Sequence, residues 1–375
     1  MAGIYIHIPF CRQACNYCNF HFSTTLTLKD ALVDAILLEL RERKNYLKNT
    51  TIQTIYFGGG TPSLLSIQQI SSILETIQLH YTVAADAEIT LEANPDDITA
   101  ELVNAWNQLG INRLSIGIQS VFDEDLVWMN RAHHAQQAKS SIAIAQQNGI
   151  HQITIDLIYG SPSLSDEKWK SNVQTAIDFG ITHLSCYALT VEPKTSLHHM
   201  IATKKLPEVD PEQGSRQFML LMEWMEAAGF DHYEISNFAK PGFQSKHNTA
   251  YWQGKHYSGI GPSAHSFNGE SRQWNVANNA LYIQGITQNA PIFEIEWLTP
   301  IQQLNEYIMT ALRTREGINT EWIAEQFGSH HKDALIKNAS KYVPTHQIKM
   351  EGSYVQLTRE GKLFADGIAA DLFFE

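Results

Sequence analysis

Short apolar runs alternate with longer amphipathic stretches through the first half of the chain. The runs predict strands near Ile4–Ile8, Thr54–Phe57, Ala87–Leu91, Arg113–Gly117, Thr154–Ile158 and His183–Ala188. Between them, Ala31–Leu40 and Ile67–Leu79 carry apolar residues at helical spacing, and Gln137–Gln147 is rich in alanine. Strands that recur about 25–50 residues apart indicate βα repeats. Six such units predict an α/β fold with a parallel sheet, either an incomplete barrel or an open doubly wound sheet.

In the second half of the chain, the pattern of apolar and polar residues changes twice. Residues 231–269 are crowded with His, Tyr, Trp, Gly and Asn, and we expect a long irregular segment that carries function. Further on, the pattern predicts helices over Thr299–Thr314 and Glu321–Phe327, a hairpin and a last helix that together resemble a winged-helix module. The hairpin pairs Gln347–Met350 with Tyr354–Leu357, and the last helix runs from about Arg359 towards Leu372. We therefore expect three parts, over residues 1–232, 233–295 and 296–375.

Composition narrows the possible partners. The 375 residues carry a formal net charge of −12, and residues 301–375 hold eight Lys and Arg against ten Asp and Glu, so binding to nucleic acid is disfavoured. The N-terminus shows no signal peptide, and no apolar run approaches the roughly 18 residues of a spanning helix. We expect a cytoplasmic protein with at most transient membrane association.

The cysteines are concentrated in one short motif. Three of the four follow the first expected strand as Cys11, Cys15 and Cys18, a C-x₃-C-x₂-C spacing, and Cys186 stands alone. One loop can wrap three thiolates around a [4Fe-4S] cluster, which ordinarily takes four cysteines. The iron without a cysteine can then bind an external ligand, and the amino and carboxylate groups of S-adenosylmethionine (SAM) suit that position. The alternative is a zinc site with His7 or His21 as the fourth ligand, although zinc sites usually pair two C-x₂-C knuckles.

Further polar or glycine-rich positions follow the next expected strands. Gly58-Gly59-Gly60-Thr61-Pro62 comes after the second strand, where it forms either a plain turn or a close backbone approach to SAM. Glu92, Gln119 and Asp156 lie at or near the ends of strands three to five. Because parallel strands gather their carboxyl ends at one edge, these groups should converge on one site.

These motifs together resemble a known family. The cysteine spacing, the GGGTP loop, the stretch Leu91–Pro95 and the stretch Ser115–Ser120 are similar to the radical SAM core of the coproporphyrinogen III dehydrogenase family. The resemblance runs from about Tyr5 to the C-terminus and implies a partial (β/α)₆ barrel with a small C-terminal helical domain. It also implies SAM-contacting roles for Tyr5, Tyr17, Gly59, Gly60, Thr61, Glu92, Gln119, Arg131 and Asp156.

The chain departs from the dehydrogenase at two points. Phe20 stands where the dehydrogenase motif has another cysteine, and only ten residues precede Cys11 where the dehydrogenase carries a long segment. Moreover, His247-Asn248-Thr249-Ala250-Tyr251-Trp252 resembles the HNxxYW signature of the heme-chaperone branch. That signature implies heme binding through His247, Asn248, Tyr251 and Trp252, with His256 and Tyr257 as alternatives. From the residues alone, the segment could equally be a structural loop, and the loop Gly259–His265 could close the SAM pocket or be a turn.

Three functions are therefore in competition. The first is a heme chaperone that carries a [4Fe-4S] cluster and SAM, receives electrons from a flavodoxin-type donor and passes heme to acceptor proteins. The second is an oxygen-independent coproporphyrinogen III dehydrogenase, and the third is another radical SAM enzyme of unknown substrate. The HNxxYW signature and Phe20 favour the first.

Overall fold

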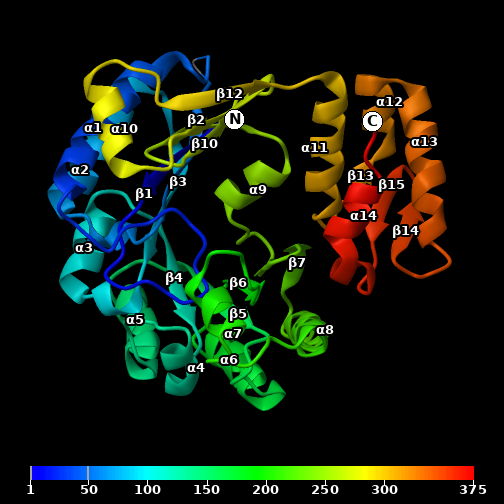
Figure 1. Ribbon diagram of the computed structural model, residues 1–375, viewed down its shortest axis with the longest axis horizontal. Coiled ribbons are helices and arrows are strands. Elements are labelled where there is room, and N and C mark those ends of the chain that lie inside the picture. Colours follow the sequence, from blue (N-terminus) through cyan, green and yellow to red (C-terminus); the bar gives the residue numbers. More distant parts are fainter. Residues whose placement is uncertain (1, 49) are drawn as a thin grey trace.

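The structure is a computed structural model and describes residues 2–48 and 50–375. Its centre is a run of six parallel strands that pair in chain order (Figure 1). These are β1 (Ala2–Ile8), β2 (Ile52–Gly59), β3 (Val83–Ala93), β4 (Arg113–Gln119), β5 (Gln152–Tyr159) and β6 (His183–Ala188). The run does not close on itself, because β1 pairs next with β9 and β6 with β8. The six expected strands and the partial barrel are thus confirmed.

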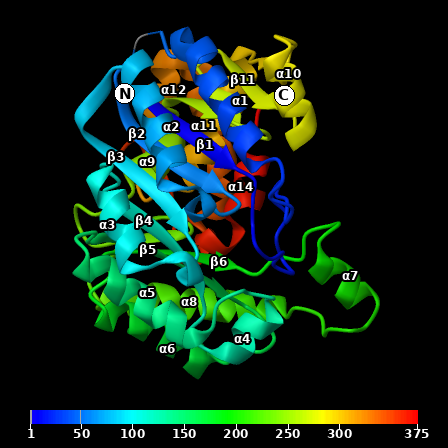
Figure 2. The ribbon, with the colours of Figure 1, turned by 90° about the vertical axis from the view of Figure 1, so that its left-hand side faces the viewer.

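Amphipathic helices cover the outer face of these strands (Figure 2). In α2, for example, Ile70, Ile73, Leu74 and Ile77 are buried at helical spacing, and a capping box formed by Ser66 begins the helix. The helices of this half are α1 (Lys29–Glu42), α2 (Ile67–His80), α3 (Ala100–Gln108), α4 (Asp123–Trp128), α5 (Ala135–Gln147), α6 (Asp166–Asp178), α7 (Ser196–Ala202) and α8 (Pro211–Ala227). α7 lies on a segment that protrudes beside β6 (Figure 2). None of the helices within the described residues is long and apolar enough to cross a membrane.

The segment that we expected to be irregular consists mostly of short strands that widen the sheet. β9 pairs parallel with β1, and β10, β11 and β12 follow antiparallel, while β8 and β7 extend the opposite edge. The bounds are β7 (Asp231–Glu234), β8 (Asn237–Ala239), α9 (Lys246–Trp252), β9 (His256–Ile260), β10 (His265–Phe267), β11 (Ser271–Asn275), α10 (Asn279–Thr287) and β12 (Phe293–Trp297). The strands were missed because each is short and is stabilised by its partners in the sheet, not by local alternation.

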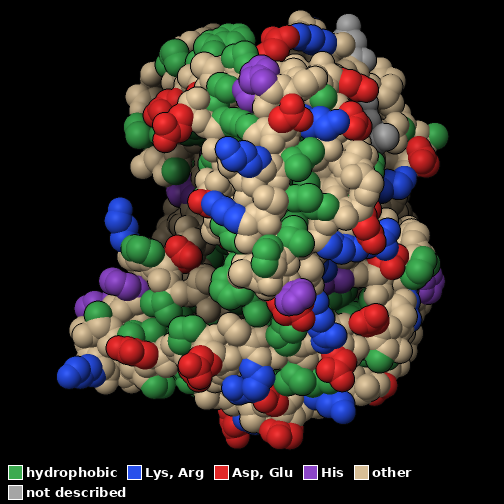
Figure 3. Space-filling view, turned by 90° about the vertical axis from the view of Figure 1, so that its right-hand side faces the viewer, with side chains coloured by type: hydrophobic (Ala, Val, Ile, Leu, Met, Phe, Trp, Pro, Cys, Tyr) green, Lys and Arg blue, Asp and Glu red, His purple; other side chains and the backbone are tan. Residues whose placement is uncertain are grey.

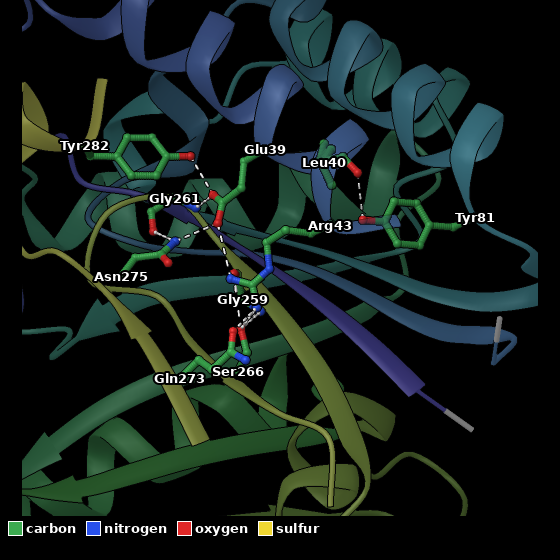
Figure 4. Close-up of polar contacts among 10 residues, drawn as sticks. All are labelled: Glu39, Leu40, Arg43, Tyr81, Gly259, Gly261, Ser266, Gln273, Asn275 and Tyr282. Carbon is green, nitrogen blue, oxygen red and sulfur yellow. Dashed lines mark hydrogen bonds and ion pairs between the residues drawn. The ribbon is translucent and has the colours of Figure 1, made fainter. Parts of the chain in front are cut away.

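A buried carboxylate anchors this extension to the barrel (Figure 4). Glu39 of α1 accepts hydrogen bonds from Tyr282 Oη at 2.6 Å, from Asn275 Nδ2 at 2.8 Å and from the Gly261 backbone nitrogen at 2.8 Å. Arg43 pairs with Glu39 at 3.3 Å. A Cβ on Gly261 would lie 2.6 Å from the His7 carbonyl oxygen, so glycine is required there. The loop Gly259–His265 therefore packs against the end of β1, and none of its residues lines the cavity that the three thiols share.

The C-terminal residues form a unit with its own hydrophobic cluster, which includes Leu304, Ile308, Ile323, Leu335 and Val355. The elements are α11 (Pro300–Leu312), β13 (Ile318–Asn319), α12 (Thr320–Phe327), α13 (Ser329–Ala339), β14 (Ile348–Glu351), β15 (Tyr354–Leu357) and α14 (Ala365–Asp371). The two helices and the hairpin are confirmed, whereas the last helix begins later than expected, after a 3₁₀ turn over Gly361–Phe364. On the face that this unit presents, basic and acidic side chains are interspersed (Figure 3).

Candidate functional site

The cysteine loop follows β1, and hydrogen bonds hold it both at its base and at its tip. At its neck, the Cys11 backbone nitrogen donates to the Ser23 carbonyl oxygen at 3.0 Å, and Ser23 donates to Pro9 at 2.8 Å. At its tip, Asn16 Nδ2 donates to the Trp128 carbonyl oxygen at 2.7 Å, and Asn130 Nδ2 donates to Ala14 at 2.7 Å. The loop is therefore held between the end of β1 and the C-terminal end of α4.

All three thiols of this loop are free and line one cavity of about 1000 Å³. Thr61 Oγ1 donates to Cys11 Sγ at 3.5 Å, and Arg131 Nη1 donates to Cys15 Sγ at 3.2 Å. Burial raises the pKa of the Cys11 thiol, and it raises the pKa of the Cys18 thiol to about 11. A bound metal therefore supplies the positive charge that favours the thiolates. Sulfur atoms that accept hydrogen bonds and share a cavity fit a [4Fe-4S] cluster.

The donor geometry disfavours the zinc alternative. Across residues 2–48 and 50–375, no three His, Cys, Asp or Glu side chains are grouped so that they could hold a single metal ion. His7 Nε2 donates to the His21 carbonyl oxygen at 3.1 Å, and His21 Nε2 donates to Asn279 Oδ1 at 2.8 Å. Neither histidine lines the cavity with the thiols.

The glycine loop presses against the end of β1. A Cβ on Gly59 would lie 2.7 Å from the His7 ring, and one on Gly60 would lie 2.7 Å from the Phe10 carbonyl oxygen. Gly59 also has a φ of 107°, which side chains rarely tolerate. Because both positions lack side chains, Thr61 can reach Cys11, and the backbone is part of the cavity wall.

Two half-buried carboxylates face the cavity from β3 and β5, the strands on either side of β4. Burial raises the pKa of Glu92 on β3 to about 7, although Tyr56 Oη donates to it at 2.8 Å and the Gly59 backbone nitrogen at 3.2 Å. Burial, and then the charge of Glu92, raises the pKa of Asp156 on β5 to about 7. Carboxyl groups in this state favour a cationic ligand, because a positive charge offsets the cost of ionising them.

The guanidinium of Arg131 forms hydrogen bonds to residues at or after the ends of several strands around this cavity. Arg131 Nη2 donates to Asn94 Oδ1 and to the Gly117 carbonyl oxygen, both at 2.8 Å, while Nη1 bonds the Cys15 thiol. Gln119 ends β4 in a left-handed conformation with a φ of 65°. Such backbone strain costs about 1–3 kcal/mol and gathers at binding sites.

Most of the expected SAM residues are brought together. Those that line the cavity are Tyr17, Gly59, Gly60, Thr61, Glu92, Gln119, Arg131 and Asp156. Tyr5 is the exception: its hydroxyl is hydrogen bonded to His7 Nδ1 at 3.2 Å, and its ring stacks on Tyr56. Sequence reasoning missed Tyr56 and Ser115 as partners of the two carboxylates. Strand alternation could have found Tyr56, because it shares a face of β2 with Gly58.

Comparison with known proteins decides the family. The family model of the radical SAM superfamily matches residues 5–176, and that of the HemN C-terminal domain matches residues 298–364. The heme chaperones HemW of Mycobacterium tuberculosis strain CDC 1551 and Bacillus subtilis strain 168 are 32% and 34% identical to this chain. Those alignments cover 99% and 98% of this chain and 94% and 98% of the two relatives. The chain belongs to the HemW family. The resemblance inferred from its motifs is confirmed.

A solved structure agrees on the fold. Coproporphyrinogen III oxidase (HemN) from Escherichia coli matches with a TM-score of 0.85 at 21% identity, over 99% of this chain and 90% of that one. At that identity the likeness shows the radical SAM fold and the C-terminal domain, not a shared activity.

The HNxxYW motif of this HemW-family chain forms α9, which lies against the barrel strands. The carboxylate of Glu88 accepts from the backbone nitrogens of Lys246 and His247, both at 3.0 Å, and so caps the first turn. The His247 ring is buried, lies 2.8 Å through Nδ1 from Thr54 Oγ1, and stacks on Tyr56 with ring centroids 4.9 Å apart. Burial lowers the pKa of His247 to about 3, so the ring is neutral.

The other residues of the motif face a second cavity, of about 1140 Å³, between α9, the sheet extension and the C-terminal unit. Asn248, Tyr251 and Trp252 line it, and His247 and His256 do not. Its remaining aromatic lining includes Phe20, Tyr187, Tyr257, Phe267, Tyr307, Trp322 and Phe327. Phe20, Tyr187, Ser236 and Arg313 line both cavities, so the two adjoin.

The first prediction concerns the metal. Anaerobic reconstitution should yield about four irons and four sulfides per chain. Cys11→Ala, Cys15→Ala and Cys18→Ala should each abolish the cluster, whereas Cys186→Ala should retain it, because Cys186 is buried in β6. Iron and sulfide analysis with the visible spectrum checks this, and stoichiometric zinc without iron would contradict it.

The second prediction concerns SAM. If its amino group pairs with the carboxylates of Glu92 and Asp156, SAM affinity should fall as the pH drops from 8 to 5.5, by about tenfold per pH unit for each proton that must be released. Glu92→Gln should flatten the profile and weaken binding on the order of 10–100-fold at pH 8. Calorimetry on reconstituted protein measures both, with Glu75→Gln on exposed α2 as the control. An unchanged affinity in Glu92→Gln would rule out this role.

The third prediction follows from the stacking of His247 on Tyr56. His247→Ala should let the Tyr56 ring move, and Tyr56→Phe removes its hydrogen bond to Glu92 directly. Both changes should weaken SAM binding by about tenfold and leave the iron content unchanged. His265→Ala, at an exposed position on β10, should behave as wild type. Wild-type SAM affinity in Tyr56→Phe would sink the idea.

Proposed function

We propose that this chain is a heme chaperone that binds heme in the second cavity and carries a [4Fe-4S] cluster and SAM in the first. Heme is a flat apolar ring with anionic propionate groups. The second cavity offers aromatic side chains for the ring, and Arg272 and Arg313 for the propionates. The relatives at 32% and 34% identity are named heme chaperones, which supports the same role here.

The observation that carries the proposal is the position of α9. Tyr251 and Trp252 are the HNxxYW aromatics, and both line the second cavity. Arg313 lies over the Trp252 ring with its Cζ atom 5.2 Å from the centroid. This pair can pack on a porphyrin face and meet a propionate at its edge.

A heme-ligand role for His247, which the motif had implied, is at odds with this position. The His247 ring meets Tyr251 edge-on at 5.1 Å and lies behind it, away from the cavity. Tyr257 is the alternative that does line the cavity, and Arg272 Nη1 donates to its hydroxyl at 3.1 Å. We propose that His247 positions α9 and that the heme iron is bound by a side chain of the cavity wall, such as Tyr257.

In this proposal, the first cavity holds the resident cofactors of the chain. Cys11, Cys15 and Cys18 would hold the cluster, and Glu92 and Asp156 would face the amino end of SAM. A cluster with bound SAM supplies one-electron chemistry, for which a flavodoxin-type donor would provide the electron. The residues of this chain bind and orient the two groups, while the heme-acceptor proteins would dock separately.

Dehydrogenase activity is the second candidate, since HemN shares the fold. Phe20 argues against it, because this residue stands at the cysteine position of the dehydrogenase motif. Its side chain is 68% exposed and lines both cavities. A phenyl ring cannot replace the chemistry of a thiol.

The fourth prediction tests the heme site. Reconstituted protein should bind about one heme per chain, as a single axial-ligand site requires. Tyr251→Ala and Trp252→Ala should each weaken binding by about tenfold or more. Trp297→Ala, the same change at an exposed tryptophan, should not. Titration of the heme absorption band measures the affinity.

Two further variants separate the roles within the motif and between the cavities. His247→Ala should keep the position of the bound-heme band, and Cys11→Ala should keep heme binding. The same preparation should not convert coproporphyrinogen III. Heme binding that is indifferent to Tyr251 and Trp252, or robust formation of protoporphyrinogen, would overturn the proposal.

A further inference from the structure

The two edges of the large sheet differ in how they are covered. At the β7 edge, the Ile235 backbone nitrogen donates to the Arg313 carbonyl oxygen at 3.1 Å, and the Arg315 nitrogen donates to the Tyr233 carbonyl oxygen at 3.0 Å. The residues that follow α11 therefore close this edge. At the other edge, β12 pairs with β11 and with no further strand of the described residues.

The outer side of β12 presents backbone groups that have no partner in the described part of the chain. The Leu298 nitrogen donates to the Glu270 carbonyl oxygen at 3.0 Å. Together with the antiparallel register, this bond places the even-numbered residues of β12 in hydrogen-bonded pairs with β11. The N–H and C=O groups that point away from β11 are therefore those of Phe293, Ile295 and Trp297.

The side chains of these three residues form an apolar row on one face of the edge. They are 42%, 41% and 65% exposed for Phe293, Ile295 and Trp297. Proteins usually protect an open edge with lysine, proline or a bulge. Here β12 contains neither residue type, and its pairing with β11 shows no shift of register. The edge is therefore open to a further strand, and its apolar row is available to cover one face of that strand.

The opposite face of β12 is acidic. Glu294 and Glu296 alternate with the apolar row and are exposed, and neither forms an ion pair within residues 2–48 and 50–375. Arg272 lies opposite Glu296 on β11, but its guanidinium is bound to Glu306. Glu296 itself accepts only from the neutral side chain of Gln302, at 2.9 Å. Two carboxylates at this edge thus remain for a partner with positive charges.

The same charges disfavour a second copy of this chain as the occupant. An antiparallel copy centred on Ile295 would place Glu294 of each chain opposite Glu296 of the other. Like charges directly opposite each other in a sheet are destabilising, whereas lysine or arginine at those positions would form favourable cross-strand pairs. The pattern of β12 therefore fits a strand that alternates apolar and basic residues.

We propose that β12 is a docking edge for a basic, extended segment of a partner protein, which adds to the sheet as a further strand. The backbone of that segment pairs with the outward groups of β12, its apolar side chains cover the apolar row, and its lysines or arginines face the two carboxylates. Arg272 of the adjacent β11 lines the second cavity, so the partner would be held one strand away from that cavity. The inference concerns an outer surface and does not depend on heme or SAM binding.

The test uses a short synthetic peptide that alternates lysine and valine, added to the full reconstituted chain. The peptide should bind saturably, and its affinity should fall as the salt concentration rises. The same peptide with glutamate in place of lysine should bind at least about tenfold more weakly. Methylation of the peptide nitrogens that would face β12 should weaken binding by about tenfold or more, because it removes the donors that strand addition needs. Fluorescence anisotropy of labelled peptides measures the affinities.

Exposed variants assign the binding to β12. Replacing both acidic residues, Glu294→Lys with Glu296→Lys, should reverse the preference in favour of the glutamate peptide. Trp297→Ala should weaken binding of the lysine peptide by about tenfold. The matched controls are Glu325→Lys on α12 and Leu79→Ala on α2, both at exposed positions, and they should behave as wild type.

A second measurement uses the wild-type chain and so does not depend on the folding of a variant. Hydrogen exchange should slow at the amides of β12 when the lysine peptide binds, and should not change at β7. Equal binding of the lysine and glutamate peptides, undiminished binding of the methylated peptide, or unchanged exchange in β12 would overturn the inference. Slower exchange in β12 that appears without peptide as the protein concentration rises would also overturn it, because it would assign the edge to a second copy.

Discussion

The buried carboxylate of Glu88 is the contact on which the arrangement of both cavities depends. It lies 3.7 Å from the Arg113 guanidinium inside the barrel and accepts from the first two backbone nitrogens of α9. These contacts fix the helix against the strands. On one side of α9, His247 stacks on Tyr56, which in turn donates a hydrogen bond to Glu92 in the first cavity. On the other side of α9, Tyr251 and Trp252 line the second cavity. The helix therefore links the two cavities indirectly, because it contacts Tyr56 on one side and lines the second cavity on the other.

The parts of the molecule that could be predicted from the sequence are those with local signals. The six strands, the C-terminal hairpin and the cysteine loop each follow from periodicity or spacing within a few residues. The convergence of Glu92, Gln119 and Asp156 also followed, because parallel strands end at one edge. By contrast, the short strands β7 to β12 depend on partners far along the chain, such as the contacts of Glu39 with Asn275 and Tyr282. Likewise, nothing local distinguishes the buried His247 from the Tyr251 that lines the cavity, since only the orientation of α9 separates them.

The two cavities differ in the chemistry that they can hold. The first has thiols and carboxylates whose pKa values burial raises, and these groups become charged most easily when a metal or a cation is bound. The second has aromatic rings and arginines, which suit a flat ring with anionic edges. Phe20 and Arg313 belong to both walls, so a ligand in one cavity can be sensed in the other through these side chains.

The central claim is that heme and SAM bind this chain in separate cavities. It is tested most directly by titrating heme into reconstituted protein with and without saturating SAM, while bound SAM is counted by equilibrium dialysis. Each chain should hold one heme and one SAM at the same time, and heme binding should not displace SAM. Displacement of SAM in proportion to the heme bound would show that the two share one site, and would contradict the account.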